Sequence, residues 1–158
     1  MTPARDYAGL AGFIALNAAV SALGGWVTAG SVGTWYQALH KPPFNPPDWI
    51  FAPVWSALYL MIAIAGWRAW RRAARQQARL ALTAYAVQLG LNLSWSFVFF
   101  GARLIGPALT VIAALLAAIL ANALLFWRIE RTAGALLLPY AAWVSFATLL
   151  NAALWRLN

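Results

Sequence analysis

Five long apolar stretches constrain the fold of this chain more than any other feature. They cover about residues 8–29, 48–67, 80–100, 105–127 and 133–155. A bilayer core about 30 Å thick is crossed by a helix of roughly 20 apolar residues. Charged residues make up only 9% of the chain, too few for a soluble domain of this size. The pattern predicts an all-α integral membrane protein, one domain over residues 1–158, folded as a five-transmembrane-helix bundle.

The positive charges are distributed unevenly between the links. Of the 11 lysines and arginines, eight precede the first stretch or lie in the second and fourth links, which five spans place on one side of the membrane. The opposite side receives Lys41, Arg103 and Arg156. This bias explains the net charge of +8 as a topology signal, so we expect no nucleic-acid partner. It predicts a cytoplasmic N-terminus and a multi-pass protein of the bacterial inner membrane, with the outer membrane as the alternative.

Several kinds of chemistry lack the residues they need. The chain has no cysteine and one histidine, His40, so we expect no disulfide, no metal site and no intrinsic cofactor. No acidic or basic residue lies deep in a predicted span, although a proton-coupled pump needs such a group. Any chemistry must therefore come from a ligand.

Prolines mark the link between the first two stretches. Residues 30–47 are too polar and proline-rich to span, and we expect Lys41–Pro47 to form an extended strap because a residue before proline avoids helical geometry. Trp35, Tyr36 and Phe44 would hold this capping loop against the helix ends. Pro139, placed inside the fifth stretch, is expected to kink it.

Polar and aromatic residues recur at helical spacing inside three stretches. Ten tryptophans are present, and most lie near the predicted span ends, as in interfacial aromatic belts. The exceptions define three faces: Trp55 and Tyr59; Gln88, Asn92, Trp95 and Phe99; and Tyr140, Trp143, Ala147 and Asn151. Indole, phenol and amide groups are costly against lipid, so these faces should point inward. The spacing leaves two alternatives open, a cavity walled by aromatics or polar contacts that hold the helices together.

Small residues also form stripes. Ala86, Gly90 and Ser94 follow each other at steps of four, and an alanine ladder runs through residues 113–121. Small residues allow helices to approach closely. Contact within the bundle and dimerisation are equally compatible with both stripes.

Three segments of the chain carry motifs in a fixed order: Trp35-Tyr36 with Lys41-Pro42, Pro46-Pro47, Phe51, Pro53, Trp55 and Tyr59; Gln88-xxx-Asn92-xx-Trp95-xxx-Phe99; and Pro139-Tyr140-xx-Trp143-xx-Phe146-Ala147-xxx-Asn151. Together they resemble the TspO/MBR family of tryptophan-rich sensory and translocator proteins, which includes the peripheral-type benzodiazepine receptors.

The resemblance implies a homodimeric receptor or carrier that binds porphyrins such as protoporphyrin IX in a cavity under the first loop. Alternative implied functions are light- and oxygen-dependent porphyrin degradation, for which Trp55 and Trp143 would be the catalytic residues, and binding of sterols or other lipids. The ligand-binding candidates are Trp35, Tyr36, Phe44, Trp55, Tyr59, Asn92, Trp95, Trp143, Phe146, Ala147 and Asn151. Lys41 is expected near the carboxylate tails of the ligand.

Two positions depart from the family pattern. Sterol-binding relatives carry a tyrosine just after the position of Asn151, and Ala152 stands there in this chain. This departure lowers the expectation of sterol binding only moderately, because such motifs are weak indicators. Phe44 occupies a position where bacterial relatives often have tryptophan, so an apolar contact is kept and an indole hydrogen bond is lost.

Overall fold

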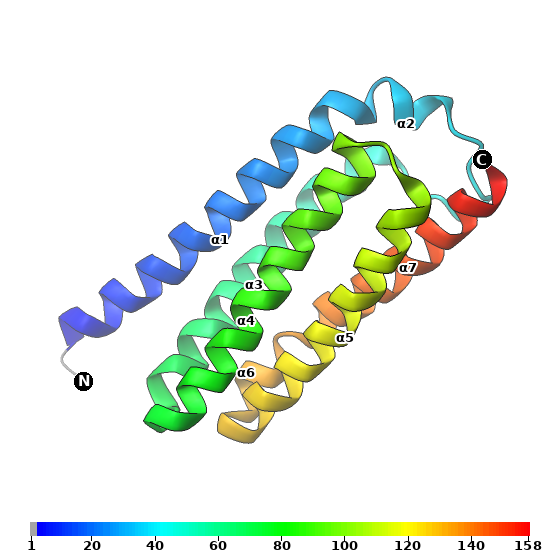
Figure 1. Ribbon diagram of the computed structural model, residues 1–158. Coiled ribbons are helices and arrows are strands. Elements are labelled where there is room, and N and C mark those ends of the chain that lie inside the picture. Colours follow the sequence, from blue (N-terminus) through cyan, green and yellow to red (C-terminus); the bar gives the residue numbers. More distant parts are fainter. Residues whose placement is uncertain (1–2) are drawn as a thin grey trace.

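Long helices dominate the structure, a computed structural model that describes residues 3–158. The chain forms α1 (Pro3–Val32), α2 (Trp35–Ala38), the 3-10 turn η1 (Asp48–Ile50), α3 (Phe51–Arg72), α4 (Arg75–Ser96), the π-turn η2 (Phe97–Gly101), α5 (Ile105–Ile129), α6 (Arg131–Ala135) and α7 (Leu138–Leu157). The long helices α1, α3, α4, α5 and α7 lie side by side, and the two ends of the chain lie at opposite ends of the bundle (Figure 1).

Four segments among the described residues are long and apolar enough to cross a membrane. They are Ala4–Val32, Asp48–Arg72, Ile105–Ile129 and Arg131–Leu157. The segment missing from this set is α4, whose first turns carry Arg75, Gln76, Gln77 and Arg79. The all-helical class and a multi-pass arrangement are therefore supported, whereas the fifth span stays a prediction.

The helix boundaries follow the prolines, with one correction. The stretch Asp48–Arg72 begins directly after Pro46-Pro47, and Pro107 lies in the first turn of α5, where a missing N–H costs no hydrogen bond. Pro139 also lies in the first turn of its helix, since α7 starts at Leu138. The predicted kink inside the fifth span is wrong, because α6 and a turn precede Pro139 and the helix starts anew there.

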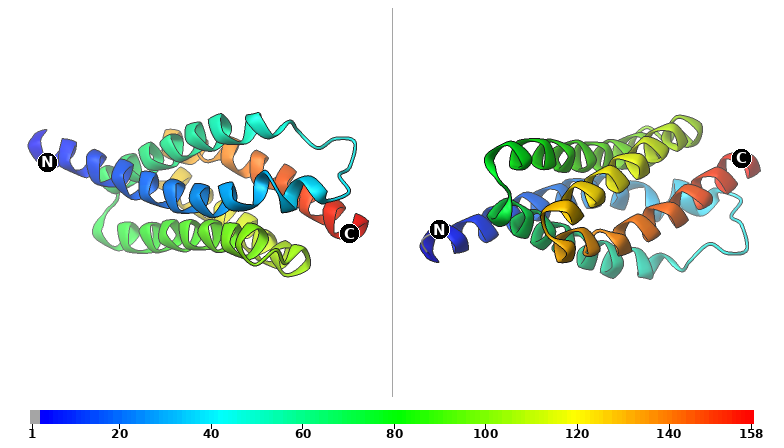
Figure 2. Two further views of the ribbon diagram at one scale, coloured as in Figure 1. Left: turned by 90° about the horizontal axis from the view of Figure 1, so that it is seen from above. Right: turned by 90° about the horizontal axis from the view of Figure 1, so that it is seen from below.

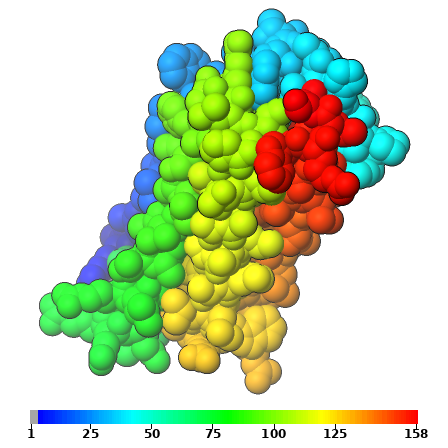
Figure 3. Space-filling view, turned by 45° about the vertical axis from the view of Figure 1, so that its right-hand side comes forward, coloured from blue at the N-terminus to red at the C-terminus, as the bar shows by residue number. Residues whose placement is uncertain are grey.

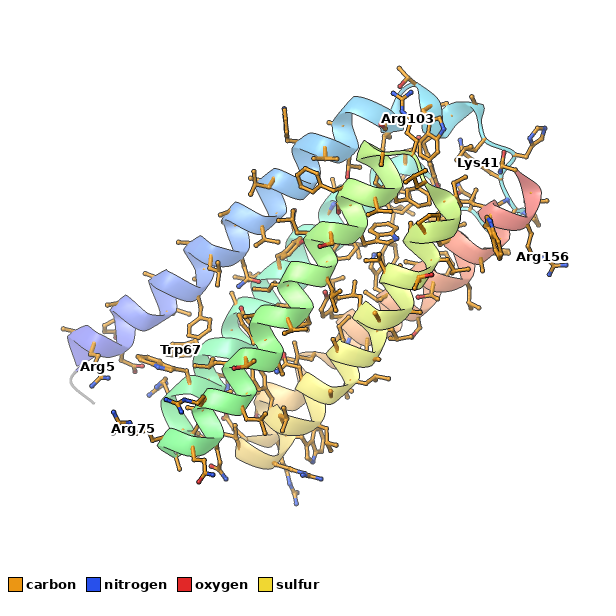
Figure 4. All side chains as sticks on the ribbon, viewed as in Figure 1. Arg5, Lys41, Trp67, Arg75, Arg103 and Arg156 are labelled. Carbon is orange, nitrogen blue, oxygen red and sulfur yellow. The ribbon has the colours of Figure 1, made fainter. Side chains whose placement is uncertain are left out.

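The charged residues separate to the two ends of the bundle. Figure 4 shows Arg5 and Arg75 at one end and Lys41, Arg103 and Arg156 at the other. At the first end Glu130 is buried, and it accepts hydrogen bonds from Arg68, one of them 3.0 Å long, and lies 3.1 Å from Arg72. This cluster connects the end of α3 to the turn between α5 and α6. The separation matches the charge bias of the sequence.

The segment between α1 and η1, residues 33–47, lies at the second end of the bundle. The helix α2 occupies its first part, before the predicted strap. The strap Lys41–Pro47 contains no helix, as predicted, but it is not extended throughout, since the backbone N–H of Asn45 donates to Pro42 O at 3.0 Å in a turn. His40 exchanges two hydrogen bonds with the Asn158 side chain, of 3.0 and 3.1 Å. Figure 3 shows the last residues of the chain, in red, against this cyan segment.

Candidate functional site

A cavity of about 360 Å³ opens between the helices in the half of the bundle near residues 33–47. This volume lies in the range of small-molecule sites. Eight of the ligand-binding residues predicted from the sequence line it: Tyr36, Trp55, Tyr59, Asn92, Trp95, Trp143, Ala147 and Asn151. The structure thus brings residues of α2, α3, α4 and α7 to one hollow.

The π-turn η2 shapes one wall of this cavity. The N–H of Ala102 donates to Phe97 O at 2.7 Å, which widens the last turn after α4. The wider turn presents Phe99 and Phe100 next to Trp95, with ring centroids of Trp95 and Phe99 stacked 5.2 Å apart. Offset aromatic contacts of this kind hold the indole of Trp95 in one orientation.

Two asparagines join the walls by hydrogen bonds between helices. Asn92 accepts from the Tyr59 hydroxyl at 2.8 Å and donates to the Tyr140 hydroxyl at 2.7 Å. Asn151 accepts from the Trp95 indole at 3.1 Å and donates to Ile105 O at 2.8 Å. The two alternatives left open by the spacing are therefore both realised, because the same amides hold the helices together and line a cavity.

Trp55 and Trp143 differ from Trp95. Both rings are half-buried and line the cavity, and among residues 3–158 neither indole N–H has a hydrogen-bond partner. Trp55 packs edge-on against Tyr140 at 6.2 Å, and Trp143 packs edge-on against Phe51 at 6.1 Å. Neither indole N–H is therefore used to hold the helices together.

Three predicted residues do not line the cavity. Trp35 packs edge-on against Phe99 at 5.6 Å, Phe44 is half-exposed and contacts Phe146, and Phe146 lies beside Trp143. Of residues 33–47, all within the described part of the chain, only Tyr36 is part of the wall. The role of this segment as a cap therefore stays a prediction.

The charge near the cavity also differs from the expectation. Lys41 is not part of the wall, since its Nζ lies 4.8 Å from the Tyr36 ring centroid and donates to Gln37 at 3.0 Å. Asp48, an acid, does line the cavity and accepts a hydrogen bond from Gln37. The expectation that Lys41 lies near the carboxylate tails of the ligand stays a prediction.

Sequence reasoning missed the wall formed by α1. Its members are small or uncharged, among them Ser21, Gly24, Gly25, Thr28 and Val32. The steps of four, three and four from Ser21 through Gly25 and Thr28 to Val32 were a readable signal for a helical face. Gln88 is the opposite case, a residue on a predicted inward face that does not line the cavity. It shares the face of Asn92, but it is fully buried and is not part of the wall.

Comparisons with known proteins agree with this architecture. The sequence profile described as the TspO/MBR family matches residues 13–156. The chain belongs to the TspO/MBR family. It is 39% identical to the "Tryptophan-rich protein TspO" of Archaeoglobus fulgidus over 140 residues, which cover 89% of this chain and 90% of that protein.

Two further relatives show the breadth of the family. The "Translocator protein" of Bos taurus is 36% identical over 149 residues, covering 93% of this chain and 88% of the relative. The "Tryptophan-rich sensory protein" of Cereibacter sphaeroides is 36% identical over 142 residues, covering 88% of each chain. The resemblance seen in the motifs is confirmed, and with it the placement in a family of membrane proteins.

Proposed function

We propose that this protein is a membrane receptor or carrier that binds porphyrins, such as protoporphyrin IX, in the aromatic cavity. The observation that carries the proposal is the pair Trp55 and Trp143, which line the cavity and whose indole N–H groups have no hydrogen-bond partner among the described residues. Sites for flat, largely apolar ligands combine aromatic walls with a few polar groups of this kind. The relatives named as sensory and translocator proteins fit a receptor or carrier.

The polar groups suggest how such a ligand would lie. Asp48 is the charged residue of the wall, so it repels the carboxylate tails of a porphyrin. We therefore place the flat ring between the two tryptophans. The carboxylate tails would then lie outside the apolar part of the cavity. Asn92 and Asn151 already have partners and act by fixing the walls.

A titration of the protein in detergent with protoporphyrin IX tests this proposal. Tryptophan fluorescence should fall saturably, and Trp55→Ala and Trp143→Ala should each weaken binding about tenfold, because each ring contributes about 1 kcal/mol beyond its buried area. Trp26→Ala is the matched control, since the Trp26 side chain is 75% exposed and does not line the cavity. Absence of saturation, or unchanged affinity in both cavity variants, would refute the proposal.

The same tryptophans favour a second candidate, photo-oxidative porphyrin degradation. Trp55 and Trp143 present half-buried indole rings to the cavity and would lie next to a light-excited ring and oxygen. Illuminating the complex in air should then bleach the Soret band, and it should do so more slowly in Trp55→Phe and Trp143→Phe. An unchanged band in the illuminated wild-type complex would refute degradation, and binding would be the one proposed function left.

We further propose that the protein assembles as a homodimer through the outer face of α4. Ala86, Gly90 and Ser94 are exposed, and a Cβ at Gly90 would meet no atom within 4 Å, so no other helix packs on Gly90. Small residues on a lipid-facing helix allow close approach of a second copy. Gly90→Leu should shift the protein in detergent from dimer to monomer in light scattering, whereas an unchanged mass would exclude this face.

A further inference from the structure

A second hollow, of about 210 Å³, lies between α1 and α3. Its wall comes only from these two helices, and three of its residues, Ser21, Ser56 and Tyr59, also line the main cavity. The two hollows therefore meet at these side chains. The second hollow is called the vestibule below.

The vestibule results from the oblique path of α1. Near its start α1 packs tightly on α3, since a Cβ at Gly9 would lie 2.4 Å from the Trp70 ring and one at Gly66 would lie 2.8 Å from Phe13. Farther along, α1 leaves α3 and packs on η2, where Ser31 Oγ donates to Phe100 O at 2.7 Å. The left view of Figure 2 shows the separation of α1 and α3 growing in this direction.

Small side chains keep this seam open. Gly25 of α1 and Ala52 and Ser56 of α3 are exposed at the surface and at the same time line the main cavity. A Cβ at Gly25 would meet no atom within 4 Å. Both segments belong to helices apolar enough to cross a membrane, so the opening faces the acyl chains.

In contrast to the seam, the end of the cavity near residues 33–47 is held together by hydrogen bonds. The Tyr36 hydroxyl donates to Asn45 at 2.7 Å, Gln37 bonds both Lys41 and Asp48, and His40 is held by Asn158 through two hydrogen bonds. A ligand that passed there would have to break this network. Among the described residues, the hydrogen bonds between α1 and α3 are those from the Trp67 indole to Asp6, near the start of α1, so passage beside the vestibule breaks none of them.

We propose that the seam between α1 and α3 is a lateral portal, through which a membrane-dissolved, largely apolar ligand passes from the acyl layer through the vestibule into the main cavity. The inference rests on the proposed function for the identity of the ligand, and on the two adjoining hollows, which share three wall residues, for the route. It predicts that filling the vestibule slows exchange in both directions and leaves the equilibrium untouched, because an obstacle on the path raises the barrier alone.

Ala18→Phe fills the vestibule without touching the main cavity. Ala18 is exposed and lines only the vestibule, and its exposed neighbour Ala19 lines neither hollow, so Ala19→Phe is the matched control. Protoporphyrin IX in donor vesicles is mixed with the protein in acceptor vesicles, and tryptophan quenching is followed in time. Ala18→Phe should lower both rates about tenfold at unchanged Kd, and Ala19→Phe should change neither. Equal rates in the three proteins would overturn the portal.

A second measurement needs no porphyrin. The chain has no cysteine, so Ala147→Cys places one thiol in the wall of the main cavity, on α7. A pyrene maleimide dissolved in the bilayer should label it, and adding Ala18→Phe should slow labelling about tenfold, whereas adding Ala19→Phe should not. Labelling that proceeds equally with Ala18→Phe would overturn the route. Slowed labelling in a protein that fails to bind protoporphyrin IX would uphold the portal and refute the proposed ligand.

Discussion

The Tyr36 hydroxyl occupies a position where its ionisation is unfavourable. Tyr36 is buried at the edge of the cavity, and its hydroxyl donates to Asn45. Burial, and next the nearby negative charge of Asp48, raise the pKa of Tyr36 to about 12, although the bond to Asn45 lowers it in part. The ionisation of this single residue thus makes the stability of the folded protein depend on pH.

This coupling predicts a loss of stability in alkali. Below pH 10 Tyr36 is protonated in the folded and the unfolded protein, and between about pH 10 and 12 only the unfolded protein ionises it, so stability falls as the pH rises through this window. Thermal unfolding in detergent should show wild type losing about 2 kcal/mol more than Tyr36→Phe between these limits. Parallel losses in the two proteins would contradict the raised pKa.

At the scale of helices, the close contact of α1, α3 and α4 depends on one glycine. A Cβ at Gly66 would lie 2.8 Å from both the Phe13 ring and the Tyr85 ring, which belong to α1 and α4. Aromatic rings packed from two sides have little room to move. The absence of a side chain at Gly66 therefore sets the distance at which α1 packs on α3, and with it the point from which the two helices diverge.

Gly66→Ala should accordingly lower the free energy of unfolding by about 1–2 kcal/mol, since the cost of overpacking exceeds the gain in helix propensity. Gly12→Ala is the control, because no atom lies within 4 Å of a Cβ there, and it should be neutral or stabilising. Unfolding in mixed micelles measures both. Equal stability of the two variants would show that the rings give way.

For the whole molecule, the separation of charge predicts the orientation and the number of spans together. Arg75 and Arg103 are exposed at opposite ends of the helical segment α4–η2, and Figure 4 shows them at opposite ends of the bundle. If α4 crosses the membrane with the N-terminus inside, these residues lie on opposite sides of that membrane. The apolarity of α4 alone does not decide this.

Labelling of single cysteines tests whether these two positions lie on opposite sides of the membrane, because the chain has no cysteine of its own. A membrane-impermeant maleimide added to spheroplasts should label Arg103→Cys directly and Arg75→Cys only after permeabilisation. The unchanged chain is the blank, because it has no thiol. Labelling of both variants from the same side would exclude α4 as a span, and reversed labelling would exclude the cytoplasmic N-terminus.

The sequence by itself predicted the long helices, the starts of two of them near residues 48 and 105, the ends that carry charge, and the three polar faces to which seven of the eight predicted wall residues belong. The eighth, Tyr36, was implied by the family resemblance. The helices and their inward faces depend on local apolarity and on helical spacing, and both can be read from the sequence alone. Pro139 was misplaced because sequence hydropathy did not reveal the break between α6 and α7.

Only the tertiary structure decided which helices diverge. The path of α1 from α3 toward η2 depends on the contacts at Gly66 and Ser31, and such contacts between distant residues leave no periodic mark in the sequence. The α1 wall, the vestibule and the pairing of Trp95 with Asn151 follow from this packing. Among residues 3–158, this packing also leaves the indole N–H groups of Trp55 and Trp143 without a hydrogen-bond partner.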